Sequence, residues 1–156
     1  MKRARLGFTM VETLVVMAVL VLMTTMAYPR ISRWRTGYDL RSAKQQVAAA
    51  IATTRAAAVQ KGRPARFIVA GNVIRAIVAT NAAGATVTVV PPIDLRATYG
   101  VTIATQNLPG NELLYGSRGV IAPQVAMPRY YLTNAAGRDS LCVSGVGVLL
   151  KRGCIQ

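Results

Sequence analysis

The chain has 156 residues, 19 lysines and arginines, five aspartates and glutamates, no histidine and a formal net charge of +14. This length allows one domain with a modest core. Without histidine there is no Ser–His pair and no histidine ligand, and the acids of the C-terminal part are scattered, so we expect neither an enzyme nor a metal or other cofactor. The charge predicts attraction to nucleic acid, anionic lipid or an acidic protein surface.

A 21-residue apolar segment, residues 8–28, follows a short basic head, residues 1–7. Glu12 is its single charge, and about 20 such residues are enough for a helix to cross a bilayer. We therefore expect a transmembrane helix with the basic head in the cytoplasm. A carboxylate in such a helix costs roughly 2.5 to 3.5 kcal/mol at mid-membrane and usually has a partner.

An ordinary secretory signal peptide is the alternative interpretation of this segment. Thr25-Met26-Ala27 ends the apolar run with small residues at the two positions that define cleavage, so the mature chain would begin at Tyr28. Glu12 argues against this alternative, because a discarded peptide has no need for a partnered carboxylate.

Helical spacing continues beyond Pro29, over residues 30–61. Pro29 removes one backbone donor and predicts a kink. The apolar stripe of this segment consists of Leu40, Ala43, Val47, Ala50, Ile51, Thr54 and Ala58. Such an amphipathic face is expected to cover a sheet, and Gly62 and Pro64 end the helix. One helix is therefore predicted over residues 8–61.

The rest of the chain is predicted to form antiparallel strands. Gly71-Asn72 is a two-residue hairpin signal, and Pro91-Pro92 ends the strand before it. The predicted strands are residues 65–70, 73–79, 86–90, 96–105 and 129–133, with a closing hairpin in residues 141–152. A long helix packed on an antiparallel sheet is an α+β fold, here with a head over residues 29–156.

Two cysteines, Cys142 and Cys154, lie close together near the C-terminus. In an exported protein this spacing predicts one disulfide, which would stabilise the fold by about 3 kcal/mol. Two buried thiols are the alternative.

Gly7 and Phe8, followed by Thr9-Met10-Val11-Glu12 and an apolar helix, resemble the class III signal of type IV pilins and type II secretion pseudopilins. The resemblance implies that prepilin peptidase cuts after Gly7 and methylates the new amine of Phe8. It also implies a subunit anchored in the inner membrane, with a periplasmic head, that joins a filament of other pilins. Glu12 would then pair with the Phe8 amine of a neighbouring subunit and set the axial register.

The C-terminal organisation resembles the GspH/FimT group of minor pseudopilins. This resemblance rests on Gly62-Arg63-Pro64 after the helix, Gly137-Arg138 before the last strands, and the ending from Val143-Ser144-Gly145 to Leu150. Some FimT-type subunits bind DNA through a Gly-Arg-x-Arg motif. This chain departs from that motif, because Val148-Leu149-Leu150 follows Gly147 and Asp139-Ser140 follows Gly137-Arg138.

The basic excess has two interpretations that the sequence leaves open. It forms either a solvated or subunit-facing surface that contacts lipid phosphates near the membrane, or a surface that holds double-stranded DNA through its phosphates. The candidate DNA-contacting residues are Arg118, Arg129, Arg138, Lys151 and Arg152. We expect a minor pseudopilin of a type II secretion system or type IV pilus, and the alternative is a DNA-binding minor pilin that acts in natural transformation.

Overall fold

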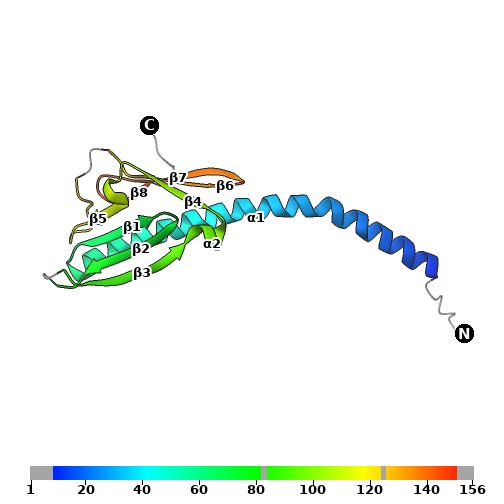
Figure 1. Cartoon of the computed structure of the whole chain (residues 1–156), viewed down its shortest axis with the longest axis horizontal. Coiled ribbons are helices and arrows are strands. Elements are labelled where there is room, and N and C mark those ends of the chain that lie inside the picture. The colour runs from blue at the N-terminus through cyan, green and yellow to red at the C-terminus, as the bar shows by residue number, and fades with distance from the viewer. Residues whose placement is uncertain (1–8, 82–83, 124–125, 151–156) are drawn as a thin grey trace, which may run out of the picture. The chain divides into compact units, whose positions relative to one another are not determined.

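A computed structural model of the chain describes residues 9–81, 84–123 and 126–150, apart from the side chains of residues 26–33. These residues divide into two compact units, one ending at Arg35 and one beginning at Thr36. Helix α1, Met10–Lys61, contributes residues to both units. All the strands belong to the second unit (Figure 1).

The first unit is the N-terminal part of α1. Its large apolar side chains between Met10 and Met23 are 44% to 83% exposed. Among the described residues, no helix has the length and apolar character needed to cross a membrane. The leader, residues 1–7, lies outside the described residues, as do Phe8 and the last three side chains of the predicted 8–28 segment. The predicted kink at Pro29 also falls where side chains are not described.

The C-terminal part of α1 ends where the sequence predicts. Gly62 follows the last helical residue with a φ of 59°, and the Arg63 N–H donates to the Ala58 carbonyl at 3.1 Å. Every residue of the predicted stripe is buried, namely Leu40, Ala43, Val47, Ala50, Ile51, Thr54 and Ala58. The Thr54 hydroxyl donates to the Ala50 carbonyl at 2.6 Å, so its burial leaves no unpaired donor. The prediction of an amphipathic helix is confirmed.

The first sheet has the strand order β3-β2-β1-β5 and is antiparallel throughout. Its strands are β1 Ala65–Ala70, β2 Val73–Ala79, β3 Thr86–Asp94 and β5 Glu112–Tyr115. The predicted hairpin at Gly71-Asn72 joins β1 to β2. The prediction that Pro91-Pro92 ends a strand is wrong, because β3 is an edge strand with a register shift against β2 at this point. Proline needs no ladder partner there.

The second sheet has the order β4-β6-β7-β8 and is also antiparallel, so the head contains two sheets where one was predicted. Its strands are β4 Thr102–Gln106, β6 Arg129–Asn134, β7 Gly137–Val143 and β8 Leu149–Leu150. The closing hairpin therefore begins before residue 141. A short 3₁₀ turn, Pro109–Asn111, precedes β5, a strand that the sequence analysis missed.

The predicted strand over residues 96–105 is wrong in its first half, which forms helix α2, Leu95–Tyr99. Asp94 caps this helix, because its Oδ1 accepts from the Arg96 and Ala97 N–H groups at 2.8 and 3.0 Å. Gly100 ends it with a φ of 63°. A helix capped at both ends outweighs the β-branched residues that favoured a strand.

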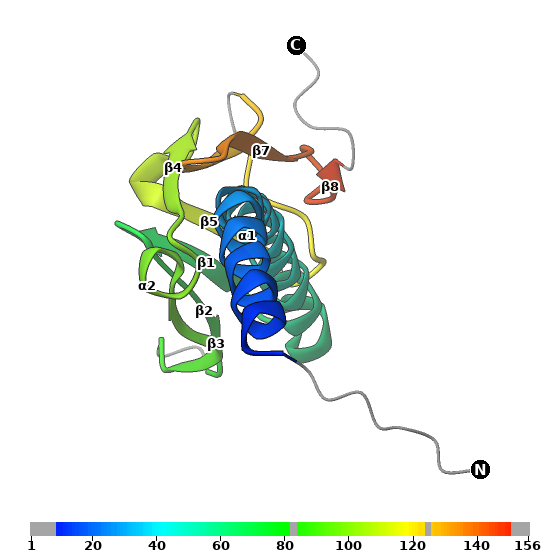
Figure 2. The same ribbon diagram turned by 90° about the vertical axis from the view of Figure 1, so that its right-hand side faces the viewer.

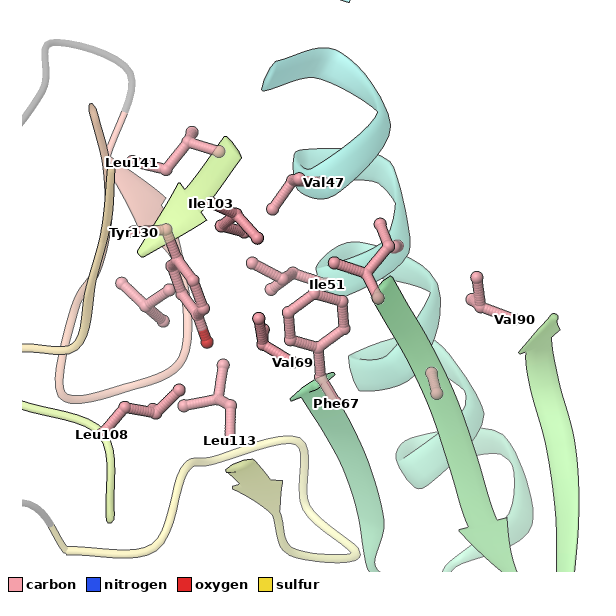
Figure 3. Packing of buried hydrophobic residues seen from close by; sticks show 14 of the residues in the cluster. Val47, Ile51, Phe67, Val69, Val90, Ile103, Leu108, Leu113, Tyr130 and Leu141 are labelled. Carbon is pink, nitrogen blue, oxygen red and sulfur yellow. The ribbon is translucent and has the colours of Figure 1, made fainter. Parts of the chain in front are cut away.

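The core lies between α1 and the inner faces of both sheets (Figure 2). Val47 and Ile51 of α1 point toward Phe67 of the first sheet and Tyr130 of the second (Figure 3). The two rings meet edge to face, with centroids 5.8 Å apart and an interplanar angle of 79°. The α+β class is confirmed. The apolar stripe of α1 packs against both sheets.

Candidate functional site

The predicted processing residues, Gly7 and Phe8, lie outside the described residues, which begin directly after them at Thr9. Thr9 caps α1: its Oγ1 accepts from the Glu12 backbone N–H at 3.3 Å, and its carbonyl accepts from the Thr13 N–H at 3.2 Å. Glu12 is the third helical residue, and its carboxylate favours the positive end of the helix dipole. Sequence reasoning missed Thr9, although Thr-x-x-Glu is a helix-start signal.

The DNA-contacting candidates Arg129 and Arg138 lie on the outer face of the second sheet. Arg138 pairs with Thr133 across the β6–β7 ladder, and Thr133 shares the strand face of Tyr131 and Arg129. Thr133 lies four positions after Arg129 along β6, which is about 13 Å at ~3.3 Å per residue. The two arginines therefore share one face but are not adjacent.

Tyr131 lies between these arginines on the same face. The Arg138 guanidinium carbon lies 3.9 Å from the centroid of the Tyr131 ring, a cation–π geometry. The Tyr131 hydroxyl donates to Gln106 Oε1 at 2.8 Å. In the described part of the chain, the buried Nε of Arg129 has no hydrogen-bond partner. Tyr131, which no sequence pattern singled out, completes a basic and aromatic surface with Arg129 and Arg138.

None of the other DNA-contacting candidates is among the residues described on this face. Arg118 lies in an exposed turn between β5 and Ile121. Lys151 and Arg152 lie outside the described residues. The structure thus brings two of the five candidates onto one surface.

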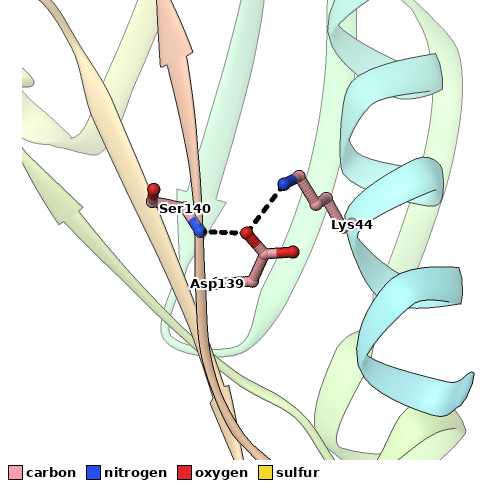
Figure 4. Close-up of polar contacts among 3 residues, drawn as sticks. All are labelled: Lys44, Asp139 and Ser140. Carbon is pink, nitrogen blue, oxygen red and sulfur yellow. Dashed lines mark hydrogen bonds and ion pairs between the residues drawn. The ribbon is translucent and has the colours of Figure 1, made fainter. Parts of the chain in front are cut away.

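The β6–β7 hairpin is held on α1 by two polar contacts. Lys44 Nζ lies 2.7 Å from Asp139 Oδ1, which also accepts from the Ser140 N–H at 2.7 Å (Figure 4). At the hairpin turn, the Asn134 side-chain amide donates to the Thr36 carbonyl at 2.7 Å. Asp139 therefore faces α1 while Arg138 faces outward.

Cys142, one of the two predicted disulfide residues, is buried on β7 with 1% of its surface exposed. Cys154 lies outside the described residues. The disulfide therefore stays a prediction.

The final hairpin contains a glycine that no larger residue could replace without displacing its neighbours. Gly147 has a φ of 80°, and a Cβ there would lie 2.7 Å from Cε1 of Tyr115. The Tyr115 hydroxyl donates to the Gly147 carbonyl at 3.1 Å. Burial raises the pKa of Tyr115 to about 12, although the nearby Arg55 lowers it somewhat. The β7–β8 turn is thus anchored to β5.

Tyr130 is buried near Tyr115 in the same core. Burial raises the pKa of its phenol, and the charge that Tyr115 would carry raises it further. Its hydroxyl has no hydrogen-bond partner within the described residues. We therefore assign Tyr130 a packing role.

Comparison with known proteins found one family-model match and one similar solved structure for the chain. Residues 2–28 match the family model of the prokaryotic N-terminal methylation motif. The chain is similar in structure to the type IV minor pilin FimU of Pseudomonas aeruginosa strain PAO1, with a TM-score of 0.56 over 72% of this chain and 87% of that chain. The sequences are 16% identical over this match. No curated protein matches the chain.

The likeness to FimU shows a pilin-like α+β fold. The methylation motif precedes that fold in the same chain. The chain therefore combines an N-terminal methylation motif with a pilin-like α+β fold.

Proposed function

We propose that the chain is a minor pilin or pseudopilin that assembles into a type IV pilus or a type II secretion pseudopilus. The observation that carries this proposal is a methylation motif over residues 2–28 joined to a head with a minor-pilin fold. Prepilin peptidase would cleave after Gly7 and methylate Phe8. We also propose that the chain belongs to the GspH/FimT group, because the C-terminal end of its head resembles that group.

In this proposal the two units of the chain do different work. Residues 8–28 anchor the precursor in the inner membrane as a single span, and the head lies in the periplasm. The exposed apolar side chains from Met10 to Met23 then pack against other pilins in the filament, since an exposed apolar surface of this kind needs a partner. A Cys142–Cys154 disulfide would form in that oxidising compartment.

Glu12 has a role in assembly because processing creates a cation near it. The new amine of Phe8 carries a positive charge, and a carboxylate and an amine in an apolar zone stabilise each other better than either is stabilised alone. Pairing between neighbouring subunits would set their axial register.

Mass spectrometry of the mature N-terminus tests the processing step. In cells that contain prepilin peptidase we expect a chain that begins with methylated Phe8, and in cells without it a chain that keeps residues 1–7. A chain that begins at Tyr28 would show an ordinary signal peptide and overturn the filament function.

Replacement of Glu12 tests the assembly step. We expect Glu12→Ala to reduce incorporation into sheared filaments by about tenfold or more, which corresponds to ~1.4 kcal/mol per tenfold. The thermal unfolding of the head should not change, because Glu12 is exposed in the first unit. Asp39→Ala is the matched control, since it removes an acid from the second unit. Equal incorporation of the Glu12 and Asp39 variants would exclude the register role.

A DNA-binding minor pilin that acts in DNA uptake is the second candidate function. The observation that favours it is the outer face of the second sheet, where Tyr131 lies between Arg129 and Arg138. Arginines on such a face could hold duplex phosphates without reading bases. The net charge of +14 would add to the attraction.

A mobility-shift titration of the full chain in neutral detergent with a DNA duplex tests this candidate. Binding at low salt should weaken steeply as salt rises. Arg138→Glu should weaken it by about tenfold relative to Arg96→Glu, an exposed arginine on α2 that serves as the control. No shift at low salt would remove the DNA function, and equal shifts for the two variants would remove this surface from it.

A further inference from the structure

A pocket of about 360 Å³ opens on the outer face of the first sheet. Its apolar lining comes from Ile77 and Ala79 of β2 and from Pro64. Thr86 of β3, Asn81 and Gly84 line another side, and the arginines Arg63 and Arg66 also contribute to the lining. The pocket thus combines an apolar floor with two cationic side chains.

Strand register explains why these residues gather there. Ala65 and Phe67 on β1 are fully buried in the core, so Arg66 between them points to the other face. Arg66 lies directly opposite Ile77, and Ala79 lies opposite Thr86. The Pro64 carbonyl accepts from the Ala79 N–H at 3.0 Å, which continues the same row.

The positive charges of the two arginines are only weakly neutralised by the described acids of the head. Arg63 is exposed and makes no ion pair with any described residue. Arg66 lies 3.7 Å from Glu112, and its side chain is 57% exposed. Such a long and solvated contact contributes little, so both guanidinium groups remain able to bind another anion.

We propose that this pocket docks an acidic side chain on a partner protein, together with an apolar residue beside it. A guanidinium offers paired donors in a planar fork that matches a carboxylate. The apolar neighbour would cover Ile77 and Ala79. Duplex DNA is a poorer fit, because its phosphates carry no apolar group that could cover this floor.

The charge inventory indicates that the partner differs in sequence from this chain. The acids of the chain are Glu12, Asp39, Asp94, Glu112 and Asp139. Asp94 caps α2, Asp139 is paired with Lys44, and Glu112 already lies beside the pocket. Two copies would instead bring net charges of +14 together, which is unfavourable. Identification of the partner as a neighbouring filament subunit rests on the proposed function, whereas the preference for a carboxylate does not.

Peptide binding to the purified full chain in neutral detergent tests the pocket. The probe is a fluorescent, end-blocked peptide of sequence Glu-Leu-Glu-Leu, and the matched peptides are Gln-Leu-Gln-Leu and Glu-Ser-Glu-Ser. We expect fluorescence polarisation to report the tightest binding for Glu-Leu-Glu-Leu. The double variant Arg63→Gln with Arg66→Gln should weaken it by about tenfold or more, and Arg96→Gln should leave it unchanged.

Four results would overturn the proposal. Two are equalities: equal peptide binding by the double variant and the Arg96 variant, or equal binding of the glutamate and glutamine peptides. The other two are displacements of the Glu-Leu-Glu-Leu peptide, either by inorganic phosphate at concentrations similar to those of the peptide, or by duplex DNA that the double variant no longer binds. Circular dichroism of each variant checks the fold. The assay does not depend on N-terminal processing, so its failure leaves the filament function standing, and failure of methylation leaves the pocket standing.

Discussion

The two parts of helix α1 contain similar apolar residues, but these side chains are exposed in the first part and buried in the second. Leu20 and Val21 in the first unit are 51% and 61% exposed, whereas Val47 and Ile51 in the second are 0% and 1% exposed. The second part packs against both sheets of its own unit. Helical spacing of apolar residues therefore does not reveal whether their partner belongs to the same chain.

The largest expected effect distinguishes the packed head from the exposed N-terminal part of α1, with the same Leu→Ala substitution made in each. Leu132→Ala in β6 should reduce the free energy of unfolding by about 2–5 kcal/mol, because Leu132 is fully buried and the change leaves a cavity. Leu20→Ala should change it by less than about 0.5 kcal/mol. Urea unfolding followed by the near-ultraviolet circular dichroism of the buried tyrosines measures both. Similar losses would mean that the N-terminal part of α1 supports the head.

A smaller loss of stability is expected in the β7–β8 turn, because tight packing of the head also limits which residues this turn can accept. Gly147→Ala should cost about 1–3 kcal/mol, since the residue has a positive φ and its Cβ would collide with Tyr115. Gly145→Ala in the same turn is the control, because its Cβ would meet nothing within 4 Å. The same urea titration compares them. If both variants are as stable as the parent, the contact between the turn and Tyr115 is not tight.

The smallest effect compares two buried tyrosines of the head. Tyr115→Phe should lower the free energy of unfolding by about 1 kcal/mol, because it removes the hydrogen bond to Gly147. Tyr130→Phe should leave it unchanged or raise it slightly, since that hydroxyl has no partner among the described residues. An equal loss in both variants would indicate a buried water on Tyr130.

The same tyrosines predict the alkaline limit of the head. Tyr115 has a pKa of about 12 in the folded chain against the ordinary value of 10.0, so the folded state keeps the proton more strongly than the unfolded state. The resulting stabilisation is complete below pH 10 and is lost as the pH rises toward 12. Tyrosinate absorbance and circular dichroism should therefore change together across this window. Ionisation of Tyr115 without unfolding would contradict its burial.

Local patterns predicted most of the fold because the responsible interactions are local. The stripe through Val47 and Ile51, the helix end at Gly62 and the hairpin at Gly71-Asn72 each depend on residues a few positions apart. Helix α2 was missed although Asp94 carried its cap, because β-branched residues around it favoured a strand. Strand β5 was missed because four residues carry too little periodicity.

The candidate surfaces were only partly predictable. Arg129 and Arg138 were named from the sequence, but their common face and the intervening Tyr131 follow from the pairing of β6 with β7. The pocket at Arg63 and Arg66 depends on the pairing of β1, β2 and β3, which no local pattern specifies.

Neighbouring residues or a short period specify the N-terminal methylation motif, the apolar stripe of α1 and the β-rich character of the head, so these features can be recognised in the sequence. The division of the head into two sheets, and the side chains that meet across the strands, follow only from the folded arrangement. A shift of one residue in strand register moves every side chain to the opposite face, so these surfaces depend on contacts distant in the chain.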